Sequence, residues 1–250
     1  EIISDSMVGC MLTKLTYYPY SCKPEDVLQA QQDMRGTYCY SDTQVFGEYP
    51  AYLLAKFKNE GVEIVKEPGD DEVMKKYPVD FVSFSYYMSS CSAASSEGLD
   101  TAVGNTVTAV KNPYLPSSEW GWQIDPIGLR ITMNEIYYRY NLPILISENG
   151  FGANDILTVD NQIHDEYRIK YLQKHINELK KAIELDGVIC LGYLSWSPID
   201  MISAGTSEMN KRYGYIYVDY DDYGNGSGKR YLKDSFYWYQ KVIASNGKVL

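Results

Sequence analysis

The stretch that decides the fold is Pro143-Ile144-Leu145-Ile146-Ser147-Glu148-Asn149-Gly150. Its apolar run is too short for a helix and has the composition of a buried parallel strand. The run ends in a carboxylate followed by Asn-Gly, a pair that turns the chain. A glutamate is costly to desolvate unless it is paired or used, and the carboxyl ends of the strands carry the active site in a parallel α/β barrel. Glu148 is therefore either a catalytic carboxylate or a solvated side chain that opens a loop.

Strands and helices alternate along the rest of the chain. Further strands are predicted at 8–15, 79–87 and 188–196, and the arm of a hairpin at 211–220. Helices are predicted at 23–35, 50–59, 70–76, 125–140, 165–185 and 233–244, and a long loop at 89–119. Buried strands that alternate with helices indicate an α/β fold with a parallel sheet, of the TIM-barrel type. Four βα units are visible and a closed barrel needs eight, so we expect half a barrel in one domain, 1–250.

The composition is that of a globular protein, with 45% hydrophobic and 22% charged residues among 250. The net charge of -10 argues against nucleic acid and anionic membranes as partners, and no apolar run is long enough to cross a membrane. The five cysteines include no Cys-x-x-Cys pair, so we expect reduced thiols, a cytoplasmic location, and neither a metal nor a cofactor. The 25 tyrosines suit either a carbohydrate cleft or plain packing.

The two histidines, His164 and His175, fall in or beside the helix predicted at 165–185. Their separation in sequence places them about 16 Å apart along such a helix. They cannot bind one metal ion together, and we expect both to lie on a solvated helix face.

Polar and aromatic side chains stand where the predicted strands end. Tyr87 ends one strand, Glu148 the next and Trp196 the last. Because the parallel strands of a barrel end on one rim, these side chains should converge. A carboxylate between aromatic walls is what the cleavage of a glycosidic bond needs.

Four segments resemble glycoside hydrolase family 1, and within it the 6-phospho-β-glucosidases. They are Ile144-Leu145-Ile146-Ser147-Glu148-Asn149-Gly150, Trp196-Ser197-Pro198-Ile199-Asp200, Trp122-x-Ile-x-Pro-x-Gly-Leu129 and Asp165-x-Tyr-Arg-Ile-x-Tyr-Leu172. The resemblance covers nearly the whole chain but corresponds to only the carboxyl-terminal half of that family's barrel, roughly strands five to eight. It implies retaining hydrolysis of 6-phospho-β-glucosides to glucose 6-phosphate and an aglycone.

The resemblance also implies roles for individual residues. Glu148 would be the catalytic nucleophile, and Tyr87 would donate the hydrogen bond that orients it. Trp196 would stack under the sugar, and Trp122 and Trp120 would line the leaving-group side. For Tyr87 and Trp196 the alternative is an ordinary aromatic core.

The segment 203–213 selects the subfamily. In the family, Ser203, Lys211 and Tyr213 would bind the sugar 6-phosphate, with the serine replacing a glutamate that ordinary β-glucosidases use to bind sugar hydroxyls. A hydroxyl, an ammonium and a phenol suit a dianion, whereas the alternative is a solvated basic turn. The small Ala204 favours glucosides, since phospho-galactosidases of the family tend to carry tryptophan there, and 6-phospho-β-galactosidase is the alternative activity.

The family's acid/base motif, Thr-x-Asn-Glu-Pro, does not occur in this sequence. Met133-Asn134-Glu135-Ile136 is similar, but it falls inside a predicted helix away from the rim. Because a retaining glycosidase needs two carboxylates roughly 5 Å apart, we expect the chain alone to be inactive. A half barrel also leaves two sheet edges open, so the expected partner is the missing amino-terminal half or a second copy. A non-catalytic module that binds phosphorylated sugars, and an assembly protein, are the alternatives.

Overall fold

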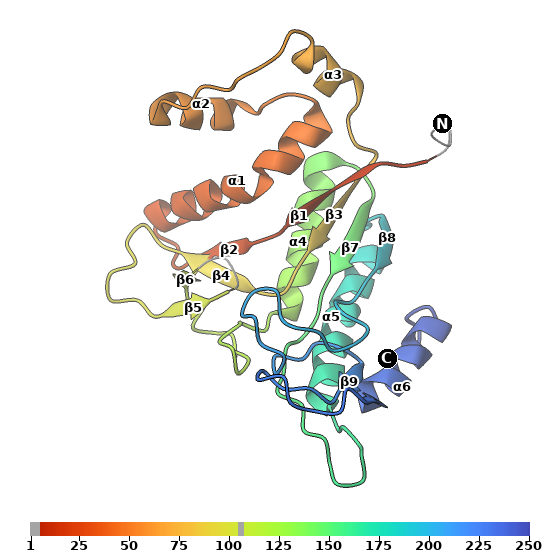
Figure 1. Cartoon of the computed structure of the whole chain (residues 1–250). Helices are drawn as coiled ribbons and strands as arrows, with labels where there is room; N and C mark the ends of the chain where they lie inside the picture. Colours follow the sequence, from red (N-terminus) through yellow and green to blue (C-terminus); the bar gives the residue numbers. More distant parts are fainter. Residues whose placement is uncertain (1–5, 105–107) are drawn as a thin grey trace.

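A computed structural model describes residues 6–104 and 108–250 (Figure 1). Its centre is a parallel sheet with the strand order β1-β3-β7-β8. These strands are β1 (Gly9–Thr13), β3 (Phe81–Ser85), β7 (Ile144–Glu148) and β8 (Cys190–Tyr193). Each lies inside a stretch predicted to be a strand, so the prediction of an α/β fold with a parallel sheet is confirmed.

Helices cover one face of this sheet. In Figure 1, α4 (Pro126–Tyr140) and α5 (Glu166–Glu184) run side by side behind the strands and contact each other. The main core forms where apolar side chains of β3 and β7 meet α4; its fully buried members include Val82, Phe84, Ile144, Ile146, Leu129, Met133 and Ile136. The other helices are α1 (Pro24–Phe46), α2 (Ala51–Glu60), α3 (Asp70–Lys76) and α6 (Asp234–Ala244).

The helix α1 runs well past the predicted end at residue 35. Its second half is held by tertiary contacts that the local sequence does not reveal. The fully buried Asp42 accepts hydrogen bonds from Arg139 Nε at 2.6 Å and from the Tyr140 hydroxyl at 2.8 Å, both on α4. The helix ends at Gly47, whose φ of 69° is the left-handed conformation that favours glycine after a helix.

The segment predicted to be a long loop, 89–119, contains three short strands of a small sheet. Its strands β4 (Ser89–Ser92), β6 (Thr108–Val110) and β5 (Thr101–Val103) join β2 (Thr16–Pro19) in the order β2-β4-β6-β5. The loop prediction is therefore wrong over these strands, and its part at 105–107 lies outside the described residues. The strands are short and consist mainly of Ser, Thr and Ala, which gives little hydrophobic alternation for a prediction.

The strand β7 carries an irregularity at Ser147. Phe84 pairs with Ile146, but Ser85 pairs with Glu148, so Ser147 has no opposing residue. Side chains alternate between the two faces of a strand, and one extra residue shifts that alternation. Without this bulge, Glu148 would share the helix-facing side of Ile146. With it, the carboxylate turns toward the rim of the sheet.

The last part of the chain contains a hairpin and a helix. The strands β9 (Ile216–Val218) and β10 (Arg230–Leu232) pair antiparallel, which confirms the hairpin predicted there. Within the described residues, no helix is long and apolar enough to cross a membrane.

The end strands of the central sheet, β1 and β8, expose apolar side chains. Met11 on β1 is 47% exposed and Leu191 on β8 is 49% exposed. Neighbouring residues outside the strands, Val8, Ile189 and Leu194, are exposed as well. Strand edges of this kind are surfaces to which another chain can add strands.

Candidate active site

Glu148 ends β7 and meets Tyr87, which follows β3. The Tyr87 hydroxyl donates a hydrogen bond of 2.9 Å to Oε2 of Glu148. Burial, together with the negative charge of Glu148, raises the pKa of Tyr87 well above its ordinary value. The phenol therefore keeps its proton and stays a donor to the carboxylate. Two residues that the sequence placed at the ends of neighbouring strands are thus in direct contact.

Asn149 fixes the backbone next to this carboxylate. Its side chain is fully buried and donates to the Tyr86 carbonyl oxygen at 2.7 Å and to the Tyr171 hydroxyl at 3.1 Å. Its oxygen accepts a hydrogen bond of 2.8 Å from the Tyr193 hydroxyl of β8. One amide therefore links the ends of three adjacent strands, a role that the turn propensity of Asn-Gly did not predict.

Aromatic rings surround Tyr87. Its ring centroid lies 5.5 Å from that of Trp122 and 6.3 Å from that of Tyr213, and the last two lie 6.4 Å apart. The loop after β7 packs tightly against this cluster, since a Cβ added to Gly152 would lie 2.8 Å from Cζ of Tyr213 and 3.1 Å from Cγ of Lys211. Only a glycine fits at this position without moving the cluster.

Lys211 is a buried cation at the edge of this cluster. Its Nζ lies 4.0 Å from the ring centroid of Trp122 and 5.8 Å from that of Trp120. Within the described residues, Nζ has no hydrogen-bond partner although the residue is only 1% exposed. Burial lowers the pKa of Lys211, and the charge of Glu208 opposes this effect. The indole faces stabilise this ammonium, and a buried ammonium without a hydrogen-bond acceptor can receive an anion.

Ser203 and Trp196 join the site through the backbone. The Ser203 N–H donates to the Glu208 carbonyl oxygen at 2.9 Å, which closes the turn that leads to Lys211. The Trp196 N–H donates to the Asn149 carbonyl oxygen at 2.8 Å, and a Cβ on Gly150 would lie 3.2 Å from Cβ of Trp196. Trp196 therefore lies beside the end of β7, and Ser203 lies in the turn that leads to Lys211.

A cavity of about 200 Å³ opens beside Glu148. It lies between the carboxyl ends of β1, β3 and β7 and the small sheet, and its lining includes Tyr17, Ser85, Tyr87, Met88 and Trp122. Among the described residues that line it, Glu148 is the only acid. Trp196 instead lines a separate hollow of about 760 Å³ beside β8 and α6, so the structure does not bring it into the same cavity.

Arg212, between Lys211 and Tyr213 in sequence, anchors the loop that carries them. Its guanidinium donates to Asp200 at 3.1 Å and to the carbonyl oxygens of Val218 at 2.8 Å and Tyr220 at 2.6 Å. Arg212 is only 2% exposed. The loop geometry around Lys211 and Tyr213 is therefore set by a buried ion pair and two backbone contacts.

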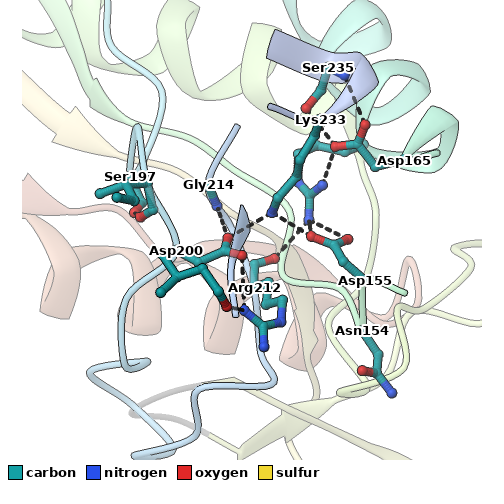
Figure 2. A network of polar contacts seen from close by, with 12 residues as sticks. Asn154, Asp155, Asp165, Ser197, Asp200, Arg212, Gly214, Lys233 and Ser235 are labelled. Carbon is teal, nitrogen blue, oxygen red and sulfur yellow. Dashed lines mark hydrogen bonds and ion pairs between the residues drawn. The ribbon is translucent and has the colours of Figure 1, made fainter. Parts of the chain in front are cut away.

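This anchor belongs to a buried network of balanced charge, drawn in Figure 2. Its charged members are Asp155, Asp165, Asp200, Arg168, Arg212 and Lys233. Lys233 Nζ donates to Asp155 and, at 2.7 Å, to Asp200, while Arg168 donates to Asp155 at 3.0 Å and to Asp165. Burial alone would raise the pKa of Asp155, but Arg168 and Lys233 hold it below its ordinary value.

Two other polar residues, Glu135 and His175, do not line this cavity. Glu135 lies within α4, as predicted for the Asn-Glu decoy, and its Oε2 is 3.5 Å from Lys14 Nζ. His175 was expected on a solvated face and is instead fully buried, so that prediction is wrong. Its Nδ1 donates to the Tyr171 carbonyl oxygen at 2.8 Å, and its ring packs against that of Tyr171 at a tilt, with centroids 3.9 Å apart.

Comparison with known proteins shows the family to which the chain belongs. Residues 1–248 match the family described as "Glycosyl hydrolase family 1", and the chain belongs to that family.

The names of curated relatives within the family describe enzymes that act on phosphorylated glucosides. Over 250 residues the chain is 51% identical to aryl-phospho-beta-D-glucosidase BglH of Bacillus subtilis (strain 168), covering 100% of this chain and 53% of that protein. It is 50% identical over 250 residues to 6-phospho-beta-glucosidase AscB of Escherichia coli (strain K12), covering 100% of this chain and 52% of that protein. The chain thus spans about half the length of the curated relatives it matches.

A solved structure is also matched over about half of its length. The family 1 β-glucosidase from Thermotoga maritima superposes with a TM-score of 0.77 at 29% identity, covering 97% of this chain and 51% of that chain. The α/β fold described above therefore matches half of a family 1 (β/α)8 barrel.

Proposed function

We propose that this chain is the carboxyl-terminal half of the barrel of a retaining 6-phospho-β-glucosidase, supplying the nucleophile and the phosphate site. The observation that carries the proposal is the contact between Tyr87 and Glu148 beside a cavity that Trp122 also lines. Nζ of Lys211, which has no hydrogen-bond partner in the described residues, lies 4.0 Å from the ring centroid of that same Trp122. The about 50% identity to enzymes named for phosphorylated β-glucosides supports this substrate class.

Glu148 attacks the anomeric carbon and displaces the aglycone oxygen, which takes a proton from an acid on the other half of the barrel. The resulting glycosyl ester on Glu148 is then hydrolysed by water, with retention of configuration. Tyr87 holds Oε2, which leaves Oε1 for the attack. Trp122 and Trp120 line the leaving-group side. Trp196, which follows β8, lines a separate hollow in this half, and its stacking under the sugar ring depends on the other half of the barrel closing the site.

Lys211, Ser203 and Tyr213 bind the 6-phosphate. Lys211 offers an ammonium that has no other hydrogen-bond partner in the described residues. Ser203 and Tyr213 are buried hydroxyls on the same loop, and a dianion takes hydrogen bonds from such donors. Ala204 leaves room beside them, which favours the gluco over the galacto substrate.

The proton donor comes from the amino-terminal half of the barrel, docked along β1 and β8. Both edge strands expose apolar side chains, and half a barrel cannot close on itself. Unpaired thiols at all five cysteines support a cytoplasmic location.

The test is complementation. The chain alone should turn over 4-nitrophenyl β-glucoside 6-phosphate at no measurable rate, and mixing it with the amino-terminal half of BglH should restore turnover. A 2-deoxy-2-fluoro glycoside 6-phosphate should label Glu148 in the mixture, and Glu148→Gln should abolish labelling. Turnover at enzyme-like rates by the chain alone, or label on another residue, would contradict the proposal. If the mixture turned over the galactoside 6-phosphate faster than the glucoside 6-phosphate, the preferred substrate would be the galactoside.

A second candidate is a non-catalytic module that binds phosphorylated sugars. The unpaired Lys211 supports it, because anion binding there requires only residues of this chain. Calorimetry with glucose 6-phosphate should then show binding that Lys211→Ala removes, while the mixture with the BglH half shows no labelling of Glu148.

A further inference from the structure

Glu208 stands at the edge of the cluster that contains Lys211. Its Oε2 accepts a hydrogen bond of 3.0 Å from the indole Nε1–H of Trp120. The same Trp120 ring lies 5.8 Å from Lys211 Nζ, and the charge of Glu208 acts on that ammonium. A carboxylate is therefore fixed beside the cation to which we assign the phosphate.

The backbone also holds Glu208 in place. Its carbonyl oxygen accepts the Ser203 N–H at 2.9 Å. The two residues after it, Met209 and Asn210, donate their N–H groups to Asp222, and the Asn210 side chain donates to the same carboxylate at 2.7 Å. The turn is thus tied at both ends, and Glu208 cannot leave the site without breaking these contacts.

A fixed carboxylate has a direct effect on a bound phosphate. The two groups carry charge of the same sign, so the carboxylate repels the phosphate and offsets part of its attraction to Lys211. The proposed reaction cleaves the bond at the anomeric carbon and leaves the 6-phosphate on the sugar. Binding energy from the phosphate is then the same for substrate and product, and an excess would only slow the release of the product.

We propose that Glu208 is a specificity-determining residue that limits the affinity of the Lys211 site for sugar phosphates, so that the phosphorylated product can dissociate. This inference rests on the assignment of the phosphate to Lys211. The physical basis is charge balance: the charges of the Glu208 carboxylate and the Lys211 ammonium sum to zero before the dianion arrives. The alternative is a purely structural carboxylate that holds Trp120 in position.

Glu208→Gln separates these two roles. The amide oxygen of glutamine can accept the same hydrogen bond from Trp120, so the position of the indole is kept while the charge is lost. The matched control is Glu119→Gln. Glu119 precedes Trp120 in sequence and is exposed, and its carboxylate accepts a hydrogen bond of 3.3 Å from the Asn154 N–H. Both variants change the net charge of the chain by the same amount.

Calorimetry with glucose 6-phosphate on the 250-residue chain, at neutral pH where the phosphate is mainly a dianion, decides the question. Glu208→Gln should bind about three- to tenfold more tightly than the wild type, with slower dissociation, and Glu119→Gln should not differ. High salt should reduce the gain. Equal or weaker binding by Glu208→Gln overturns the inference.

A third variant, Lys211→Met, distinguishes failure of the inference from failure of the proposed function. If Lys211→Met loses binding but Glu208→Gln gains none, Glu208 is structural and the phosphate assignment stands. If Lys211→Met binds as the wild type does, or if neither the wild type nor Glu208→Gln binds, the assignment fails and the inference with it.

Discussion

The hydroxyl of Tyr87 donates a hydrogen bond of 2.9 Å to Oε2 of Glu148, joining the ends of β3 and β7. The donor is neutral and the acceptor is a carboxylate, which makes the bond stronger than one between two neutral groups. Because burial raises the pKa of Tyr87, the proton stays on the phenol. One carboxylate oxygen is thus held while the other is free.

Tyr87→Phe removes this donor and leaves the ring in place. In the complemented enzyme we expect kcat/KM to fall about tenfold to a hundredfold, because a hydrogen bond to a charged group contributes about 1.5–3 kcal/mol. The matched control is Tyr114→Phe, on a tyrosine that is 91% exposed. An unchanged rate of labelling of Glu148 by the 2-fluoro glycoside in Tyr87→Phe would show that the contact does not orient the carboxylate.

The sequence predicted where Glu148 falls along the chain but not which way it points. Strict alternation from Ile144 and Ile146, both fully buried against the helices, would send Glu148 into the same core. The bulge at Ser147 reverses the alternation. A bulge depends on pairing with the neighbouring strand, so the pattern of one strand cannot reveal it.

Long-range contacts account for the other parts that the sequence did not reveal. The positions of the four strands and of the helices followed from local sequence signals, except that α1 runs past its predicted end. The small sheet around β4 and β6 depends on pairing with β2, which lies far away in sequence. The buried network likewise joins Asp155, Arg168 and Lys233 from separate segments, and single charged residues in loops give no signal of such partners.

The buried network predicts a large loss of stability in Lys233→Met. The substitution leaves Asp155 and Asp200 with one cation fewer in a region without water contact. Breaking a buried ion pair by removal of one partner costs about 3–5 kcal/mol. Urea unfolding followed by circular dichroism should show this difference in the free energy of unfolding.

The control for that variant is Lys170→Met. Lys170 forms an exposed pair with Glu166 one helical turn away, at 3.2 Å. Such pairs contribute little to stability, so its unfolding midpoint should stay near that of the wild type. Equal midpoints for Lys233→Met and Lys170→Met would mean that the network is not what holds the loop.

Because His175 is buried, we expect the free energy of unfolding to fall in mild acid. Burial lowers its pKa from 6.5 to about 4, and its Nε2 has no hydrogen-bond partner in the described residues. Between these two pH values the imidazole binds a proton in the unfolded chain but not in the folded chain. The contribution of His175 to the free energy of unfolding is therefore fully present above pH 6.5 and is lost as the pH falls toward 4. Between pH 7 and pH 5 the free energy of unfolding should fall by about 2 kcal/mol through His175.

Urea unfolding at the two pH values tests this assignment. In His175→Phe, which keeps an aromatic ring against Tyr171, the difference between pH 7 and pH 5 should shrink by about that amount. In His164→Gln it should not shrink, because the pKa of the exposed His164 is raised by its hydrogen bond to Asp234, which gives the opposite sign. A pH dependence that is the same in His175→Phe and the wild type would contradict the assignment.

The exposed edge of β8 predicts how the chain associates. Leu191→Lys places a charge on that edge, and charged side chains on edge strands oppose pairing with another chain. Sedimentation velocity should show less self-association of the isolated variant than of the wild type, and the variant should complement the BglH half poorly. Leu185→Lys is the matched control, since Leu185 is 69% exposed at the end of α5 and not on a strand. If the wild type is a monomer at all concentrations and Leu191→Lys complements normally, the open edge is not the docking surface, and the other half of the barrel must reach Glu148 by another route.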